Sequence, residues 1–164
     1  MENNDLIKTG IAGLDALLST ILVVDDEPAL RGMAGTILKH SGYCVVTANN
    51  GRGAVDTFRQ NPSEIAVILL DMTMPVMGGA DAFRLIREIQ PGVPIIVSTG
   101  YSETFAREEL GFDVVAEFLQ KPYNAARLVE SIREALQHDA QAVDRRTSHD
   151  LARRTHVDGA RVRN

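Results

Sequence analysis

Short apolar runs recur along the chain and alternate with segments of helical periodicity. Continuous apolar residues occupy Ile21 to Val24, Ile65 to Leu70 and Pro94 to Val97, a pattern typical of strands that are buried on both faces of a parallel sheet. Tyr43 to Ala48 and Val114 to Leu119 predict two more strands. A glutamate interrupts the last of these runs, so we expect that strand at an edge of the sheet.

Apolar residues spaced three or four apart lie between these runs and predict helices. The first helix follows Pro28, a residue suited to the first helical position, and we expect Gly42 to end it. The apolar stripes of the later helices are Ala54 and Phe58, then Ala82, Phe83, Ile86 and Ile89, and finally Ala125, Leu128, Ile132 and Leu136.

The segment Ser102–Leu110 predicts a weakly held helix. It carries three glutamates and an arginine, with only Phe105, Ala106 and Leu110 to bury. Because packing of an apolar face supplies most of a helix's stability, we expect this helix to be the most mobile one. With it, strand and helix alternate five times over residues 20–137, which predicts a doubly wound α/β domain with right-handed crossovers.

Two local features carry narrower expectations. Gly78-Gly79 predicts a loop that needs positive φ angles, and this glycine pair does not form a phosphate cradle. Cys44, within an apolar strand, is expected to be an inert core residue. As the single cysteine of the chain, it excludes an intramolecular disulfide and cannot form a zinc cluster by itself.

The chain has 164 residues and a net charge of −5, which allows one compact domain with some tail. Its longest apolar run is far too short to span a bilayer, and its acidic N-terminus lacks the features of a signal peptide. We therefore expect a cytoplasmic protein. Residues 138–164 carry six arginines and four aspartates but no aromatic residue, which favours a disordered basic tail over a nucleic-acid-binding segment.

Charged and hydroxyl side chains follow four of the predicted strands. They are Asp25-Asp26, Asp71, Thr99 and Lys121, and ligands of open parallel sheets bind beyond these carboxyl ends. Three crowded carboxylates call for a hard divalent cation such as Mg²⁺, whereas Lys121 and Thr99 suit a phosphoryl group. A carboxylate in such surroundings can act as a nucleophile and form an aspartyl phosphate.

The motifs around these residues resemble those of two-component response-regulator receiver domains. The matching strings are Ile-Leu-Val-Val-Asp-Asp-Glu-Pro at 21–28, Leu-Leu-Asp-Met-Thr-Met-Pro-Val-Met-Gly-Gly at 69–79, Ser-Thr-Gly-Tyr-Ser at 98–102, and Lys121-Pro. The resemblance covers residues 20–137, in family order and spacing. It implies a five-stranded, flavodoxin-like parallel sheet in strand order 2-1-3-4-5, with an N-terminal extension at 1–19 and the tail at 138–164.

The resemblance also implies roles for the residues of the site. Asp71 would be the phosphoacceptor, Asp26 would bind Mg²⁺ directly, and Asp25 would hold it largely through water. The backbone carbonyl of Thr73 would be a further protein ligand. Thr99 and Lys121 would contact the phosphoryl oxygens, and Phe118 falls where the family places its aromatic switch residue.

The same resemblance indicates partners. The phosphoryl group would come from a phosphohistidine on a sensor histidine kinase or a phosphotransfer protein. A downstream protein would read the face built from the fourth helix, fifth strand and fifth helix, and a homodimer is left open. Such a chain catalyses only its own phosphorylation and dephosphorylation. The pattern at 98–102 is similar to receivers attached to hybrid histidine kinases.

Water must reach an aspartyl phosphate in line with the bond that breaks. In the family, the residues that border this approach correspond to Thr73 and Tyr101. Thr73 is too short to orient water, whereas Tyr101 is bulky enough to cover the path. Neither is a good general base near neutral pH. We therefore predict slow autodephosphorylation.

Two other functions fit the sequence less well. A haloacid-dehalogenase-type phosphatase needs a second aspartate two residues after the nucleophile, where Thr73 stands, and a nucleophile at the end of the first strand. A phosphorylation-independent interaction module usually lacks one of the acidic or lysine positions, and all of them are present here.

The segment Ile7 to Leu18 resembles the opening of RecA-like ATPases of the circadian-clock type. Those proteins need a glycine-rich phosphate loop, and none follows, so the sequence excludes ATPase activity for this chain. A remnant, a short amphipathic helix and an interaction arm all stay open for this segment.

Overall fold

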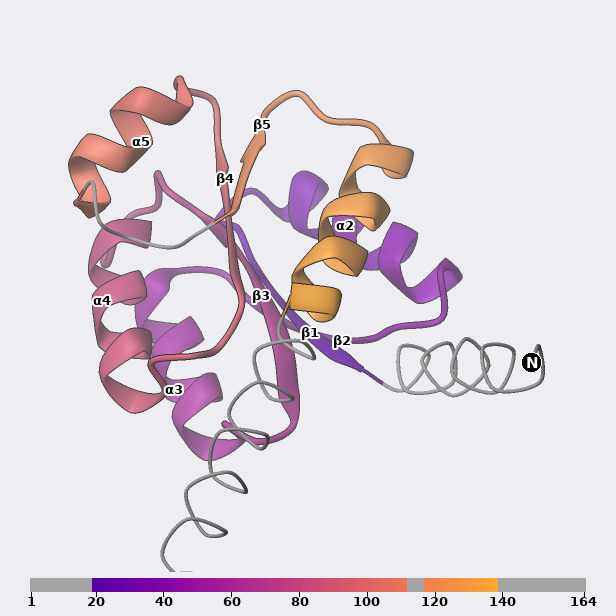
Figure 1. Cartoon of the computed structure of the whole chain (residues 1–164), viewed down its shortest axis with the longest axis horizontal. Coiled ribbons are helices and arrows are strands. Elements are labelled where there is room, and N and C mark those ends of the chain that lie inside the picture. Colours follow the sequence, from indigo (N-terminus) through magenta and orange to yellow (C-terminus); the bar gives the residue numbers. More distant parts are fainter. Residues whose placement is uncertain (1–18, 112–116, 139–164) are drawn as a thin grey trace, which may run out of the picture.

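The computed structural model describes residues 19–111 and 117–138. Within them, five parallel strands form one sheet in the order β2-β1-β3-β4-β5 (Figure 1). This confirms the predicted fold class and strand order. Residues 1–18, residues 139–164 and the first part of the predicted fifth strand lie outside the described residues. The strands are β1 (Thr20–Val24), β2 (Cys44–Ala48), β3 (Ile65–Asp71), β4 (Ile95–Thr99) and β5 (Glu117–Gln120).

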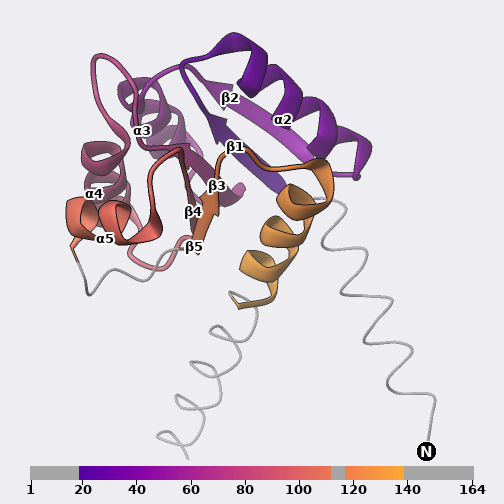
Figure 2. The ribbon, with the colours of Figure 1, turned by 90° about the horizontal axis from the view of Figure 1, so that it is seen from above.

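Helices cover both faces of the sheet. Helices α3, α4 and α5 lie on one face, and α2 and the helix at residues 125–138 lie on the other (Figure 2). The buried side chains on each face form one hydrophobic cluster. None of the helices in the described ranges is long and apolar enough to cross a membrane. The labelled helices are α2 (Pro28–His40), α3 (Gly51–Gln60), α4 (Gly79–Ile89) and α5 (Glu103–Leu110).

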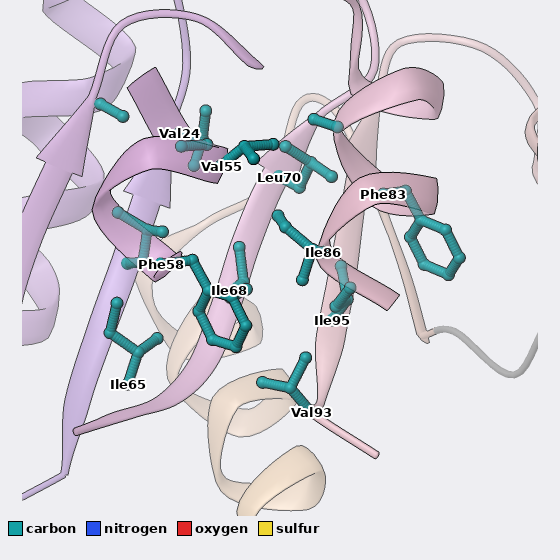
Figure 3. Close-up of a cluster of buried hydrophobic side chains, with 14 of the residues drawn as sticks. Val24, Val55, Phe58, Ile65, Ile68, Leu70, Phe83, Ile86, Val93 and Ile95 are labelled. Carbon is teal, nitrogen blue, oxygen red and sulfur yellow. The ribbon is translucent and has the colours of Figure 1, made fainter. Parts of the chain in front are cut away.

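The central strand β1 explains why the apolar runs are continuous. Leu22 and Val24 belong to the cluster under α3, α4 and α5, which Figure 3 shows in close-up, whereas Ile21 and Val23 belong to the cluster on the opposite face. All four side chains are at most 1% exposed. Successive residues of a strand point to opposite faces, so a strand covered on both sides needs apolar residues at every position.

The ends of the helices follow the expected chemistry. Pro28 stands in the first turn of α2, and Gly42 follows that helix with a φ of 93°, the left-handed conformation that favours glycine. The Ser102 side chain accepts a hydrogen bond from the backbone N–H of Phe105 and caps α5. The positions of Pro28 and Gly42 confirm the predicted start and end of α2.

The expectation for Gly78-Gly79 is wrong. Gly78 has a φ of −70° and precedes α4, whereas the positive φ in this loop, 70°, belongs to Val76. The backbone N–H of Met77 donates to the carbonyl oxygen of Pro75 at 2.8 Å across Val76. Gly79 is required for a different reason: a Cβ there would overlap the backbone carbonyl oxygen of Asp71.

The expectation that Cys44 is a core residue is also wrong, because its side chain is exposed. Strand β2 lies at an edge of the sheet, and only Ala48 of its five residues is buried. An apolar run does not distinguish a central strand from an edge strand, so its composition overstated the burial. The predicted edge position of the fifth strand is confirmed.

The buried apolar face of helix α5 is even smaller than its sequence predicts. Ala106 and Leu110 are buried as expected, whereas Phe105, the third candidate, is 44% exposed. The physical basis for weak attachment is therefore present, whereas the greater mobility of α5 stays a prediction.

Candidate functional site

Three acidic residues gather at the carboxyl edge of the sheet. Asp25 directly follows β1, Asp26 comes next, and Asp71 is the last residue of β3. Their carboxylates each offer an oxygen within 4.8 Å of the others. Asp25 and Asp71 are each 5% exposed as residues, whereas Asp26 is exposed. The sequence-based expectation that these residues lie together is confirmed, and we call them the acidic cluster.

Lys121 bridges the two buried members of the acidic cluster. Its Nζ donates hydrogen bonds to Asp25 Oδ2 and Asp71 Oδ1, both at 2.9 Å. The lysine follows β5, and its backbone N–H donates to the carbonyl oxygen of Thr99 at 2.8 Å. The Lys121-Pro122 peptide bond is cis. Lys121, which is 96 positions from Asp25 in the sequence, is thus held as the counterion of Asp25.

The turn after β1 is held by contacts that sequence reasoning missed. The backbone N–H of Glu27 donates to Asp25 Oδ1 at 2.8 Å, and Arg31 Nη1 donates to the backbone carbonyl oxygen of Asp25 at 2.6 Å. Arg31 lies near the start of α2, four residues after Glu27, and a cation at that position is the signal that could have identified it. These bonds fix the backbone and side chain of Asp25, whereas Asp26 is the exposed member of the cluster.

Thr99 ends β4 and is only 2% exposed. Its hydroxyl oxygen accepts a hydrogen bond from the backbone N–H of Tyr101 at 3.0 Å, which leaves the hydroxyl proton available for an acceptor. The Tyr101 ring packs against Phe105 with 4.8 Å between ring centroids, and Tyr101 is 53% exposed. Thr73, exposed in the loop after β3, lines a groove of about 450 Å³ together with Thr99 and Tyr101.

Burial and charge act in opposite directions on the central pair. Burial raises the pKa of Asp71 above its ordinary value, and hydrogen bonding to Lys121 only partly offsets this. Burial alone would lower the pKa of Lys121, but its hydrogen bonds to Asp25 and Asp71 outweigh that effect, and the pKa is raised. Lys121 therefore keeps its proton at neutral pH.

The donor set suits a hard divalent cation. Three carboxylates offer oxygen ligands within reach of one another, and a single lysine neutralises only part of their charge. Mg²⁺ binds through one or two carboxylates and retains several waters, so the exposed position of Asp26 fits its requirements. The residues present are thus compatible with Mg²⁺.

The fold and the site together define a class. The chain is a flavodoxin-like α/β domain whose carboxyl edge carries an acidic cluster bridged by lysine. The family model for the response regulator receiver domain matches residues 21–133. The chain belongs to this family of two-component signalling domains.

Curated relatives agree with this assignment. Chemotaxis protein CheY of Thermotoga maritima is 33% identical over 115 residues, which cover 70% of this chain and 94% of that protein. Transcriptional regulatory protein GlrR of Escherichia coli is 32% identical over 138 residues, covering 82% of this chain but 30% of GlrR. The chain thus spans less than a third of the length of GlrR and a still smaller share of the sensor kinase CckA of Brucella abortus.

Solved structures show the same fold. A response regulator receiver domain protein from Clostridium thermocellum superposes with a TM-score of 0.70 at 29% identity, covering 76% of this chain and 98% of that one. Response regulator TrrA from Thermotoga maritima, solved in complex with Mg²⁺ and BeF, has a TM-score of 0.65 at 32% identity, with coverage of 72% and 99%.

The position of Asp71 disagrees with the phosphatase alternative. Asp71 ends β3 and not β1, the first strand along the chain, where a haloacid-dehalogenase-type phosphatase carries its nucleophile. Receiver domains are generally not enzymes in the usual sense, and the family assignment places this chain with them.

The predicted switch residue Phe118 lies in β5. It is partly buried against the cluster beneath α3, α4 and α5.

Proposed function

We propose that Asp71 accepts a phosphoryl group from a phosphohistidine on a sensor histidine kinase or a phosphotransfer protein. In this transfer a carboxylate oxygen of Asp71 forms the new bond to phosphorus. The phosphorus–nitrogen bond breaks, and its electron pair stays on the imidazole nitrogen. The observation that carries the proposal is the position of Lys121, whose ammonium lies 2.9 Å from carboxylate oxygens of both Asp25 and Asp71.

We assign the remaining site residues from their positions. Asp26, Asp71 and the backbone carbonyl of Thr73 would hold Mg²⁺ directly, and Asp25 would hold it largely through water. When bound, the ion supplies positive charge that offsets the repulsion between phosphoryl oxygens and carboxylates. Lys121 adds a fixed positive charge, and the Thr99 hydroxyl donates a hydrogen bond to a phosphoryl oxygen.

The signal would leave the site through Thr99 and Phe118 to a partner protein. We assign this output to the face formed by α5, β5 and the helix at residues 125–138. A homodimer through the same face stays compatible with this assignment. Proteins with similar segments include regulators such as GlrR and sensor kinases such as CckA and LuxN, which supports a histidine kinase or a phosphotransfer protein as the phosphoryl donor.

The proposed organisation is a receiver domain at residues 20–137, between an extension at 1–19 and a basic tail at 138–164, in the cytoplasm. The complete acidic cluster and Lys121 favour phosphorylation over the alternative of a phosphorylation-independent interaction module.

The test is labelling by acetyl phosphate in the presence of Mg²⁺, followed by intact mass. The wild-type chain should gain one phosphoryl group, and Asp71→Asn should gain none, because the amide is nearly isosteric but is not a nucleophile. Asp56→Asn is the matched control: Asp56 is an exposed aspartate on α3 that pairs with Arg59, so this variant should label like the wild type. Labelling of folded Asp71→Asn at the wild-type level would contradict the proposal.

A further inference from the structure

A cationic side chain covers the aromatic ring of β5. The central guanidinium carbon of Arg107, on α5, lies 4.6 Å from the centroid of the Phe118 ring. The negative face of an aromatic ring attracts such a cation within about 6 Å. Nearby Glu103 accepts from Arg107 Nε at 2.8 Å, and its Oε1 lies 2.7 Å from Arg107 Nη2. One carboxylate therefore holds the guanidinium through two of its nitrogens while it rests on the ring.

This contact differs from the other arginine–aromatic contact in the described part of the chain. Arg87 lies 5.0 Å from the Phe83 ring, but both residues belong to α4, so their contact moves with one helix. Arg107 and Phe118 belong to different elements, and any motion of the ring relative to α5 changes their contact. The small buried face of α5, formed by Ala106 and Leu110, gives this surface contact more weight in positioning the helix.

The position of Phe118 connects the contact to the phosphoryl site. In the parallel register of β4 and β5, Phe118 pairs with Val97, and Gln120 pairs with Thr99. Phe118 packs on the same cluster that lies beneath α4 and α5. Its ring is thus bordered by the apolar cluster and by the Arg107 guanidinium. Phe118 also lies two residues before Gln120, the residue of β5 that pairs with Thr99.

We propose that Arg107, held by Glu103, is a positioning residue that keeps the Phe118 ring in its resting place. It thereby sets how readily phosphorylation at Asp71 changes the face formed by α5, β5 and the helix at residues 125–138. This inference rests on the proposed function. Movement of the ring away from α5 must give up the cation contact, so the contact stabilises the resting arrangement alone, and a contact present in one state biases the equilibrium between the two. The strength of such contacts at exposed sites corresponds to a factor of about two to five in that equilibrium.

The experiment follows the Phe118 ring signals by NMR while beryllofluoride, a phosphoryl mimic, is titrated in the presence of Mg²⁺. In Arg107→Gln, which keeps a polar chain but removes the charge, the resting Phe118 signals should shift toward their beryllofluoride-bound positions. The midpoint of the titration should fall about two- to fivefold. Arg107→Lys retains a cation and should restore most of the wild-type behaviour, and Glu103→Gln should give an intermediate result.

Arg59→Gln is the matched control. Arg59 is an exposed arginine on α3 that pairs with Asp56 at 3.6 Å, so its substitution should leave the Phe118 signals and the midpoint unchanged. All variants should melt near the wild-type temperature, which separates positioning from loss of fold. Wild-type signals and midpoint in Arg107→Gln would overturn the inference, and so would equal effects of Arg107→Gln and Arg107→Lys.

The proposed function can fail separately. If the wild-type chain shows no response to beryllofluoride and Mg²⁺, the phosphoryl site is refuted. The resting Phe118 signals, which need no ligand, still compare Arg107→Gln with Arg107→Lys and report on the positioning role.

Discussion

Removing the positive charge at the centre of the site should destabilise the fold. Lys121→Met keeps an unbranched chain of similar length but deletes two charge-assisted hydrogen bonds of 2.9 Å. The Asp25 and Asp71 side chains, only 7% and 8% exposed, would then repel each other without a counterion. Breaking a buried pair costs about 3–5 kcal/mol. Because the Lys121 side chain is 21% exposed, we expect the free energy of unfolding to fall by about 2–4 kcal/mol.

The loss should depend on pH. The pKa of Lys121 is raised in the folded state, so this lysine adds to the free energy of unfolding of the wild type. That contribution is fully present below the ordinary lysine pKa and is lost only as the pH rises through the pKa of the folded state. Lys121→Met removes the ammonium group whose hydrogen bond and charge lower the pKa of Asp71. Burial, which raises that pKa, is then unopposed. A carboxyl with a raised folded pKa contributes stability in acid and loses it as pH rises through that pKa. The deficit should therefore be larger at pH 7 than at pH 5.

Urea unfolding without Mg²⁺, at both pH values, measures this effect. Lys39→Met, at an exposed position in the last turn of α2, is the matched control and should change stability by less than about 1 kcal/mol. The double variant Lys121→Met with Asp71→Asn should recover part of the loss, because one of the repelling charges is gone. A loss in Lys121→Met no greater than in Lys39→Met would refute its role as counterion.

Three further predictions concern the metal and the phosphoryl group. Mg²⁺ should raise the free energy of unfolding of the wild type by about 1.4 kcal/mol when the Mg²⁺ concentration is ten times the dissociation constant. Asp26→Ala should lose most of this stabilisation in thermal melts, and a wild-type melting temperature that does not change with millimolar Mg²⁺ would contradict the site. Thr99→Ala should still accept phosphate but should not shift the Phe118 NMR signals, and equal shifts in both proteins would exclude coupling through Thr99. Tyr101→Ala should release phosphate faster than the wild type, whose Tyr101 lines the groove beside Thr99; a rate no faster, with the fold unchanged, would exclude shielding by Tyr101.

The site could be predicted from the sequence because it depends on strand ends. Once Ile21 to Val24 and Ile65 to Leu70 are recognised as buried parallel strands, Asp25 and Asp71 must lie at one edge of the sheet. Lys121 follows by the same reasoning from the last strand. The structure brings their side chains into contact, as expected.

Features that depend on tertiary neighbours could not be predicted in this way. Cys44 stands in an apolar run, but the run forms an edge strand, and nothing in its composition shows which neighbours it lacks. Gly79 is required by the nearby carbonyl of Asp71, a close approach that local sequence does not encode. The contact between Arg107 and Phe118 joins two elements through their surface geometry, which hydrophobic periodicity does not specify.

The most direct test of the central claim is to locate the phosphoryl group after transfer from a protein phosphohistidine. The wild-type chain would be incubated with Mg²⁺ and phosphorylated histidine kinases or phosphotransfer proteins, and the acyl phosphate would be reduced with borohydride. Reduction converts a phosphorylated aspartate to the corresponding alcohol, which peptide mass spectrometry locates. We predict a single reduced position at Asp71. Reduction at Asp25 or Asp26 with Asp71 unmodified would contradict the account.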